Sequence, residues 1–286
     1  MGNINIITYY RNICNRLTPL YSENEAKRIA QILLQRVTGK PIFHFLANNS
    51  NTLSALQLSE AEEYLSQLKL QKPIQYIIGE TEFFGINLRI TPDVLIPRPE
   101  TEELVDWVIK SNVLPKPRIL DFGTGSGCIA IALAKNIASS EVTALDISPE
   151  AIALAKQNAA AVGIEVDFFV FDILGNSPWP SGNQFDIIVS NPPYVRESEK
   201  RLMGKNVLDF EPHMALFVND GQPLIFYDAI ARYADSLLKT GGVVFCEVNE
   251  AFGRETADLF AMHGFADVQV KGDINGKERM VKAVKK

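Results

Sequence analysis

The chain has 286 residues, 47% of them hydrophobic and 22% charged, which suits a globular protein with one large domain and one small one. Its formal charge of −6 disfavours a broad nucleic-acid-binding surface, and it contains neither an apolar run of membrane-spanning length nor a signal-peptide pattern. The three cysteines and three histidines are widely separated, so no disulfide framework, metal site or histidine-based triad is indicated. We therefore expect a cytoplasmic protein that uses no metal, binds no membrane and forms no stable complex with nucleic acid.

Residues 1–72 predict a small helical bundle. Two S-x-x-E patterns, Ser22 with Glu25 and Ser59 with Glu62, are typical of the capping boxes that start helices, and each precedes apolar residues at helical spacing. The part before residue 41 is mildly basic. This charge suits either a solvated surface or a module that docks a macromolecular partner, and the sequence leaves both interpretations open.

Residues 73–95 predict a β-hairpin that links this bundle to the rest of the chain. Two segments, 73–79 and 81–90, have the character of strands separated by a turn. The chain is then interrupted by Pro97-Arg98-Pro99. Pro99 is well placed as the first residue of a helix, because its fixed φ suits that position and glutamates in the following turn complement the helix dipole.

Residues 96–286 predict one large α/β domain. Apolar runs alternate with helical periodicity, which favours a doubly wound parallel sheet with an antiparallel edge at the C-terminus. A long polar segment, 195–221, interrupts the alternation. A first strand is expected to end just before Asp121, and further strands are expected at 141–146, 167–171, 185–190, 242–248, 266–271 and 279–284, with helices starting near Ser126, Ser148 and Leu224.

A glycine-rich turn joins the first of these strands to its helix. Asp121 is followed by glycine at every second position, Gly123, Gly125 and Gly127. Glycine permits positive φ and close approach of a ligand, but the third glycine comes one place too early for the dinucleotide-binding fingerprint. A carboxylate just before the turn suits a ligand with an ammonium group, such as the methionine part of S-adenosylmethionine. The alternative is a tight turn that binds no ligand.

Acidic residues also end the next two strands. Asp146 follows Gly123 by 23 residues, close to the spacing of about 20 residues at which a carboxylate reaches the hydroxyls of a ribose. It could instead be a turn residue before the Ser148 helix cap. Asp172 could accept a hydrogen bond from an adenine amino group or could simply start a loop.

The tetrad Asn191-Pro192-Pro193-Tyr194 ends a further strand. The Asn191 carboxamide oxygen and the rigid Pro192 carbonyl could accept both hydrogens of a planar NH₂ group, while the Tyr194 ring stacks on it. The nitrogen of such a group is a poor nucleophile, so its alignment with an electrophilic methyl and strengthening hydrogen bonds would supply the catalysis. The alternative is a proline-rich turn without a catalytic role.

Taken together, these motifs resemble class I S-adenosylmethionine-dependent methyltransferases that act on planar amino nitrogens. The stretches P-I-Q-Y-I-I-G at 73–79, E-F-F-G at 82–85 and I-P-R-P-E-T-E at 96–102 are similar to the glutamine methyltransferases of peptide chain release factors, the HemK/PrmC family. Glu211-Pro212 with Ala215-Leu216, and Asp273 through Gly276 to Arg279, add to this resemblance.

The resemblance implies a Rossmann-like class I methyltransferase fold with a seven-stranded, mostly parallel sheet, a small N-terminal helical bundle and a β-hairpin linker. It implies a release-factor-docking domain at 1–72, a linker at 73–95 and a catalytic domain at 96–286. It also implies methylation of the glutamine amide in the Gly-Gly-Gln loop of class I release factors, with S-adenosylmethionine converted to S-adenosylhomocysteine.

The site residues follow from this resemblance together with the motifs. Catalysis is assigned to Asn191, Pro192 and Tyr194, and the glutamine is expected to bind at Asn191, Pro192, Pro193 and Tyr194. The family often has an aromatic residue on the adenine where this chain has Ile173, which can cover the ring but not stack. The expected cofactor-binding residues are Asp121, Gly123, Thr124, Gly125, Ser126, Gly127, Asp146, Asp172, Ile173 and Asn191.

Two other functions use the same motifs. A methyltransferase acting on adenine or guanine in DNA or ribosomal RNA can carry a similar N-P-P-Y tetrad, but it would need a basic nucleic-acid surface. A translation-associated binding protein could retain the cofactor fold without catalysis. The net charge weighs against the first alternative and the intact motifs against the second.

Overall fold

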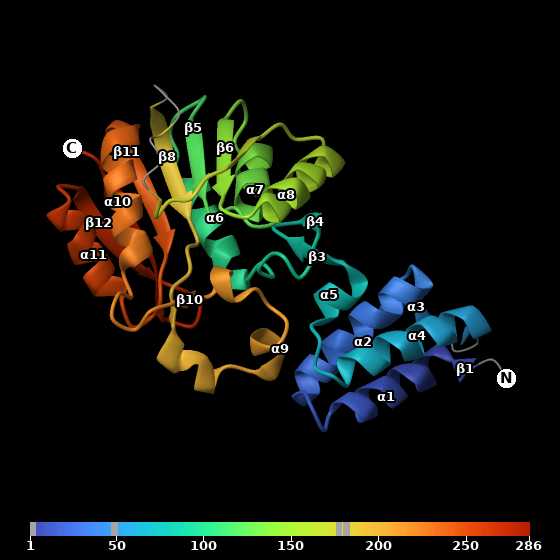
Figure 1. Cartoon of the computed structure of the whole chain (residues 1–286). Coiled ribbons are helices and arrows are strands. Elements are labelled where there is room, and N and C mark those ends of the chain that lie inside the picture. Colours follow the sequence, from blue (N-terminus) through green and yellow to red (C-terminus); the bar gives the residue numbers. More distant parts are fainter. Residues whose placement is uncertain (1–3, 47–50, 176–178, 180–183) are drawn as a thin grey trace. The chain divides into compact units, whose positions relative to one another are not determined.

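The computed structural model describes residues 4–46, 51–175, 179 and 184–286, and it divides the chain into two compact units (Figure 1). The helical unit comprises residues 1–80 together with the distant segment 204–210. The sheet unit comprises residues 81–203 and 211–286. Within the described ranges, no helix combines the length and the apolar character that crossing a lipid bilayer requires.

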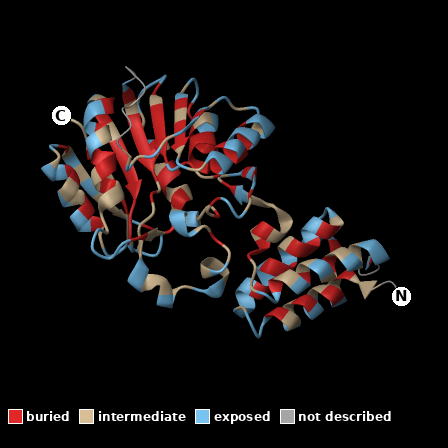
Figure 2. Cartoon of the chain, in the orientation of Figure 1, coloured by how far each residue is buried: buried red, intermediate tan, exposed pale blue. Residues whose placement is uncertain are grey.

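Helices dominate the first unit, as predicted. Their buried faces form one core, which includes Ile13, Leu33 and Leu65 and appears as buried stripes on the longer helices in Figure 2. A pair of two-residue strands, which the sequence did not indicate, runs antiparallel beside them. The elements are β1 (Ile4–Asn5), α1 (Ile6–Leu17), α2 (Glu23–Thr38), α3 (Phe43–Leu46), β2 (Thr52–Leu53), α4 (Ala55–Leu68), α5 (Ile74–Ile78) and, from the later segment, α9 (Lys205–Leu208).

One of the two predicted helix starts is confirmed and the other is wrong. Ser22 caps α2 by accepting a hydrogen bond from the Glu25 backbone N–H. Helix α4 starts before Ser59, because Ser54 and Gln57 form a complete capping box at its N-terminus. This Ser54–Gln57 pair caps free backbone N–H groups of the first turn. The helix has therefore already begun when the chain reaches Ser59.

The predicted strand at 73–79 is also wrong. Residues Ile74–Ile78 form helix α5, which starts after Pro73 and ends at Gly79 in the left-handed conformation (φ 75°). A short apolar run fits a buried helix as well as a strand, and here the proline before it and the glycine after it mark helix ends. The hairpin is therefore shorter than expected and consists of β3 (Glu80–Phe83) and β4 (Ile86–Arg89).

The sheet unit contains the predicted seven-stranded, mostly parallel sheet. Its order is β12-β13-β11-β8-β5-β6-β7, and β13 runs antiparallel to both of its neighbours. The strand β11 starts at Leu238, earlier than the predicted Gly242, with an irregularity between Leu238 and Val243. The strands are β5 (Arg118–Phe122), β6 (Glu141–Asp146), β7 (Asp167–Val170), β8 (Phe185–Ser190), β11 (Leu238–Glu247), β12 (Ala266–Gly272) and β13 (Glu278–Val284).

Helices cover both faces of this sheet, so its central strands are buried (Figures 1 and 2). On one face, α6 (Pro99–Ser111), α7 (Cys128–Asn136) and α8 (Pro149–Val162) share an apolar core with the strands and the hairpin. On the other face, α10 (Ile225–Leu237) and α11 (Gly253–Met262) share a second core. This burial explains why the central strands read as continuous apolar runs.

The polar segment 195–221 contains only short elements. Two two-residue strands, β9 (Val195–Arg196) and β10 (Phe217–Val218), pair in parallel and bring its ends together. Between them lie the 3₁₀ helices η1 (Glu197–Leu202) and η2 (His213–Ala215), as well as α9 of the helical unit. The segment begins directly after the N-P-P-Y tetrad.

Candidate active site

The glycine-rich turn lies between β5 and α7, and all three of its glycines have positive φ. The φ angles are 72° at Gly123, 55° at Gly125 and 82° at Gly127. A Cβ on Gly127 would lie 3.0 Å from Ile131 Cδ1 and 3.1 Å from Ala155 Cβ, so this glycine allows close packing of the turn on the helices. A Cβ on Gly125 would meet nothing within 4 Å. The turn is therefore closely packed against the protein at Gly127, whereas at Gly125 it leaves space for a ligand.

The two polar side chains of the turn are buried rather than displayed. The Thr124 hydroxyl donates to Asp121 Oδ2 at 2.7 Å, and the Thr124 backbone N–H donates to the Leu145 carbonyl at 2.8 Å. The Ser126 carbonyl accepts from the Asn158 amide at 2.9 Å, and its side chain is 1% exposed. The backbone groups of both residues hold the turn in place on β6 and α8, while their side chains are buried.

Asp121, which precedes this turn at the end of β5, has a buried carboxylate in which one of the two oxygens is unpaired within the described part of the chain. Its Oδ2 accepts from Thr124, while Oδ1 has no hydrogen-bond partner among the described residues. Burial and the charge of Asp146 raise the pKa of Asp121 to about 7. An unpaired buried carboxylate oxygen is costly unless a cation approaches it. The residues present therefore fit a ligand that brings an ammonium group to the turn.

Asp146 lies at the end of β6 and faces the same turn. Its Oδ2 accepts from the Gly125 backbone N–H at 2.8 Å, and its Oδ1 accepts from the Ser148 N–H at 3.0 Å. Burial raises the pKa of Asp146, and the hydrogen bonds from these two backbone groups oppose that effect. Each carboxylate oxygen can accept a second hydrogen bond, so the geometry remains compatible with the predicted ribose contact.

Asp172 and Ile173 follow β7 beside this site. The exposed Asp172 side chain accepts from the Leu174 backbone N–H at 2.9 Å, which is the contact of a residue that starts a loop. Ile173 is partly buried and packs against the core on the α10 and α11 face. Their roles beside an adenine stay predictions.

Asn191 follows β8, whose neighbour β5 leads into the glycine turn. A Cβ on Gly123 would lie 4.0 Å from the Asn191 carbonyl oxygen, so the turn and the tetrad meet at this edge of the sheet. The Asn191 side-chain Nδ2 donates to Thr101 Oγ1 at 3.0 Å. Its Oδ1 accepts no hydrogen bond from the described residues and is not buried. The carboxamide therefore presents an acceptor to a ligand.

Tyr194 is held by a residue that the sequence analysis did not assign to the site. Its hydroxyl donates to Glu247 Oε1 at 2.8 Å, and Thr101 Oγ1 donates to Glu247 Oε2 at 2.6 Å. Glu247 is 1% exposed and ends β11. The rule that ligands bind at the carboxyl ends of parallel strands could have identified it, just as it identified Asp121 and Asp146. Thr101 carried no comparable signal, because it lies within a helix.

A buried ion pair ties the segment after the tetrad to the start of α6. Arg98 donates to Glu211 Oε1 at 2.6 Å, and the Ile96 backbone N–H donates to Glu211 Oε2 at 3.3 Å. The Glu211 side chain is 1% exposed, whereas that of Arg98 is 32% exposed. Asn249 adds a further contact by donating to the Tyr194 carbonyl at 3.2 Å. These bonds restrain the polar segment at its start and at Glu211.

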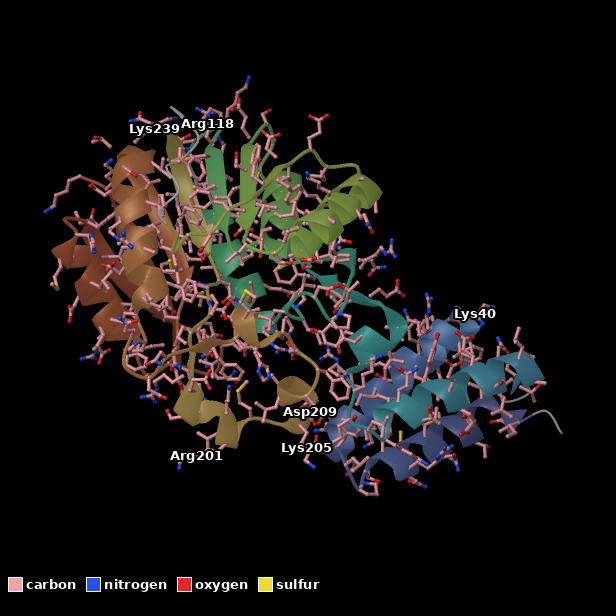
Figure 3. All side chains as sticks on the ribbon, viewed as in Figure 1. Lys40, Arg118, Arg201, Lys205, Asp209 and Lys239 are labelled. Carbon is pink, nitrogen blue, oxygen red and sulfur yellow. The ribbon has the colours of Figure 1, made fainter. Side chains whose placement is uncertain are left out.

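The opposite ends of the strands carry half-buried cations with structural partners. Arg118 and Lys239, labelled in Figure 3, lie at the amino ends of β5 and β11 and interact with Glu141 and Asp186, respectively. In the part of the chain that the structure describes, no group of three or more His, Cys, Asp or Glu side chains could hold a metal ion.

Two family models match separate parts of the chain. Residues 10–79 match the PrmC N-terminal domain, and residues 101–209 match the methyltransferase small domain. The first match covers most of the helical unit, and the second covers the glycine turn, Asp146 and the tetrad.

Curated relatives match almost the whole chain. A release factor glutamine methyltransferase of Flavobacterium psychrophilum is 42% identical over 97% of this chain and 98% of its own length. One of Bacteroides thetaiotaomicron is 43% identical over 98% of this chain and 99% of its own. Among solved structures, a Pyrococcus furiosus methyltransferase has a TM-score of 0.52 at 17% identity and covers 78% of this chain and 98% of that one, which supports the fold.

Proposed function

The chain belongs to the family of release factor glutamine methyltransferases, and we propose from this premise how its residues perform the reaction. The enzyme transfers a methyl group from S-adenosylmethionine to the side-chain amide nitrogen of the glutamine in the Gly-Gly-Gln loop of a peptide chain release factor. It acts in the cytoplasm, where translation terminates, and the site is assigned no metal.

The observation that carries this proposal is the free acceptor on Asn191. Its Oδ1 is unpaired among the described residues, while its Nδ2 is engaged by Thr101. Together with the Pro192 carbonyl, it can accept the two N–H groups of a glutamine side chain, and the Tyr194 ring can stack on the amide plane. These acceptors bind the nitrogen more strongly as it gains positive charge, which favours the transition state over the bound substrate.

The cofactor is assigned to the glycine turn and the carboxylates beside it. S-adenosylmethionine supplies an electrophilic methyl group, and S-adenosylhomocysteine is its product. Asp121 would pair with the ammonium group through its unpaired Oδ1, and Asp146 would accept from the ribose hydroxyls. Gly123, Gly125 and the backbone around them leave room for close approach of the ligand. Asp172 and Ile173 are assigned to the adenine edge and face.

The helical unit is assigned to docking of the release factor, with residues 1–72 as the docking domain, 73–95 as the linker and 96–286 as the catalytic domain. This unit has its own buried core and therefore presents a defined surface. The mildly basic N-terminal part suits an acidic patch on a protein partner.

Label transfer from tritiated S-adenosylmethionine tests the function. The substrates are a release factor, the same factor with its loop glutamine changed to alanine, and DNA or ribosomal RNA, all in the presence of EDTA. We expect label only on the unmodified release factor. Label on nucleic acid alone would instead identify an adenine- or guanine-directed enzyme, and no label on any substrate would identify a non-catalytic binding protein.

A further inference from the structure

Two side chains behind the tetrad, Thr101 and Glu247, join Asn191 and Tyr194 in one hydrogen-bonded chain. Asn191 donates to Thr101 at 3.0 Å, Thr101 donates to Glu247 at 2.6 Å, and Tyr194 donates to the other oxygen of Glu247 at 2.8 Å. They come from separate elements, since Thr101 lies in α6, Glu247 ends β11, and Asn191 and Tyr194 follow β8. Thr101 and Glu247 are each 1% exposed, so water does not compete for these bonds.

The direction of each bond is set by the number of protons available. A threonine hydroxyl has one proton, and an ionised carboxylate only accepts. Because the Thr101 proton is donated to Glu247, the hydroxyl has only lone pairs to offer to Asn191. The Asn191 carboxamide must then turn its NH₂ group toward Thr101, and its oxygen faces the opposite way.

We propose that Thr101 and Glu247 are positioning residues that fix which end of the Asn191 carboxamide faces the substrate. The inference rests on the proposed function, because only a substrate that donates N–H groups needs an acceptor at this position. A rotation of the Asn191 amide by about 180° would present its own NH₂ group to the glutamine NH₂ group, and two donors repel each other. Shape alone does not prevent this rotation, because the two ends of a carboxamide have nearly the same size.

The rotated state is disfavoured by what it would leave behind. Thr101 would have to donate to the Asn191 oxygen, and one oxygen of the buried Glu247 carboxylate would lose its partner. An unsatisfied buried charge is costly, so the carboxylate selects the productive orientation through the hydroxyl. Burial raises the pKa of Glu247, whereas the bonds from Thr101 and Tyr194 and the Arg279 charge favour its ionised form.

The same carboxylate also positions the aromatic ring of the site. Its second oxygen accepts from the Tyr194 hydroxyl, which holds the ring from its far end. The Tyr227 hydroxyl donates to the Glu247 backbone carbonyl at 3.1 Å and so restrains the end of the strand. Glu247 thus couples the acceptor and the stacking surface, and neither can move without disturbing the other.

Isosteric variants separate this role from simple packing. Thr101→Val keeps the shape of the side chain but removes the hydroxyl. Glu247→Gln also keeps the shape, but it replaces one of the two accepting oxygens with an NH₂ group, which donates a hydrogen bond instead. Thr101→Ser keeps the hydroxyl. The matched control is Thr256→Val in α11, because Thr256 is fully buried and its hydroxyl has no partner among the described residues. Urea unfolding of each variant verifies that it is folded before its kinetics are compared.

The expected kinetic result is a loss in kcat. Thr101→Val and Glu247→Gln should each lower kcat on the order of 100-fold, as removal of a preorganised transition-state contact does. The KM for release factor should change less than about threefold, because docking is shared over a larger surface. Thr101→Ser and Thr256→Val should stay within about threefold of wild type. The double variant of Thr101 and Glu247 should be no slower than the slower single variant, since groups that act as a unit are not additive.

A kcat of Thr101→Val near wild type, a Thr101→Ser variant as slow as Thr101→Val, or losses that multiply in the double variant would each overturn the inference. If wild type itself fails to label release factor, the proposed function is wrong. The positioning role is then tested by a measurement that needs no methyl transfer. Hydrogen exchange of the Asn191 side-chain NH₂ group by NMR, assigned by its loss in Asn191→Ala, should be slow in wild type and Thr101→Ser and fast in Thr101→Val. Equal exchange rates in all three proteins would refute the positioning role.

Discussion

Asp121 and Asp146 stand at the carboxyl ends of neighbouring parallel strands, and burial together with the Asp146 charge raises the pKa of the Asp121 carboxyl to about 7. In an unfolded chain the same carboxyl has a pKa of about 3.9. The folded protein therefore holds this proton more tightly than the unfolded chain does. Two predictions follow from this difference, one for stability and one for the cofactor.

Without cofactor, the stabilising contribution of protonated Asp121 should be complete below about pH 4 and should be lost as pH rises to about 7, because the unfolded chain binds fewer protons in this interval. Asp121→Asn cannot ionise and removes this dependence. We expect the variant to match wild type in urea midpoint near pH 4 and to exceed it by a margin that grows up to about pH 7 and persists at pH 8. A difference between the two proteins that does not change with pH would show that the raised pKa is absent.

Binding of S-adenosylmethionine should release a proton below pH 7, because an ammonium group beside Asp121 favours its ionised form. Calorimetry at pH 6 in buffers of different ionisation enthalpy measures this release directly. Asp121→Asn should release no proton from this position and should bind about 10- to 100-fold more weakly, the range for a lost hydrogen bond to a charged group. Proton release that persists in the variant would assign it to another group.

Asn191→Ala should reduce methyl transfer by at least about 100-fold, because it removes the acceptor that positions the glutamine amide. Cofactor affinity should remain close to that of wild type, since the carboxylates and the glycine turn are unchanged. Asn136→Ala is the control, because Asn136 is exposed at the end of α7 and its side chain bonds only its own helix. A collapse of cofactor affinity with substrate binding intact would mean that Asn191 belongs to the cofactor site.

Gly127→Ala and Gly163→Ala separate two effects of glycine in this fold. Both positions have positive φ, 82° and 74°, but a Cβ meets Ile131 and Ala155 only at Gly127 and nothing within 4 Å at Gly163. Gly163→Ala should cost about 1–2 kcal/mol of the free energy of unfolding through backbone strain. Gly127→Ala should cost about 1–3 kcal/mol more through overpacking. Urea unfolding checks both values, and equal losses would contradict the packing role of Gly127.

Glu211→Gln should lower the free energy of unfolding by about 1–3 kcal/mol, because it weakens a buried charged contact to Arg98 and to the Ile96 backbone. Glu141→Gln is the matched control, since the Glu141 side chain is 74% exposed in its pair with Arg118. An exposed pair of this kind is worth at most about 1 kcal/mol. Urea midpoints compare the two variants, and a smaller loss at Glu211 than at Glu141 would contradict the anchoring role.

The short apolar run at 73–79 illustrates where local pattern is insufficient. Its composition fits a strand, yet the chain forms α5 between Pro73 and Gly79 and packs it on the helical unit. Periodicity cannot distinguish a strand from one and a half turns of helix over so few residues. The longer segments of the sheet unit were predicted correctly, because each carries a run of apolar residues with a turn or a cap at its end.

By itself, the sequence determined the alternating α/β order, the glycine turn, the acids at the strand ends and the tetrad after β8. Each of these is a local pattern whose chemistry follows from neighbouring residues. Only the tertiary structure decided that Asn191 meets Thr101, 90 residues away, and that Thr101 meets Glu247, 146 residues away. Such pairs depend on which elements the folded sheet and helices bring together in a buried space, and no local spacing encodes which hydroxyl will meet which carboxylate there.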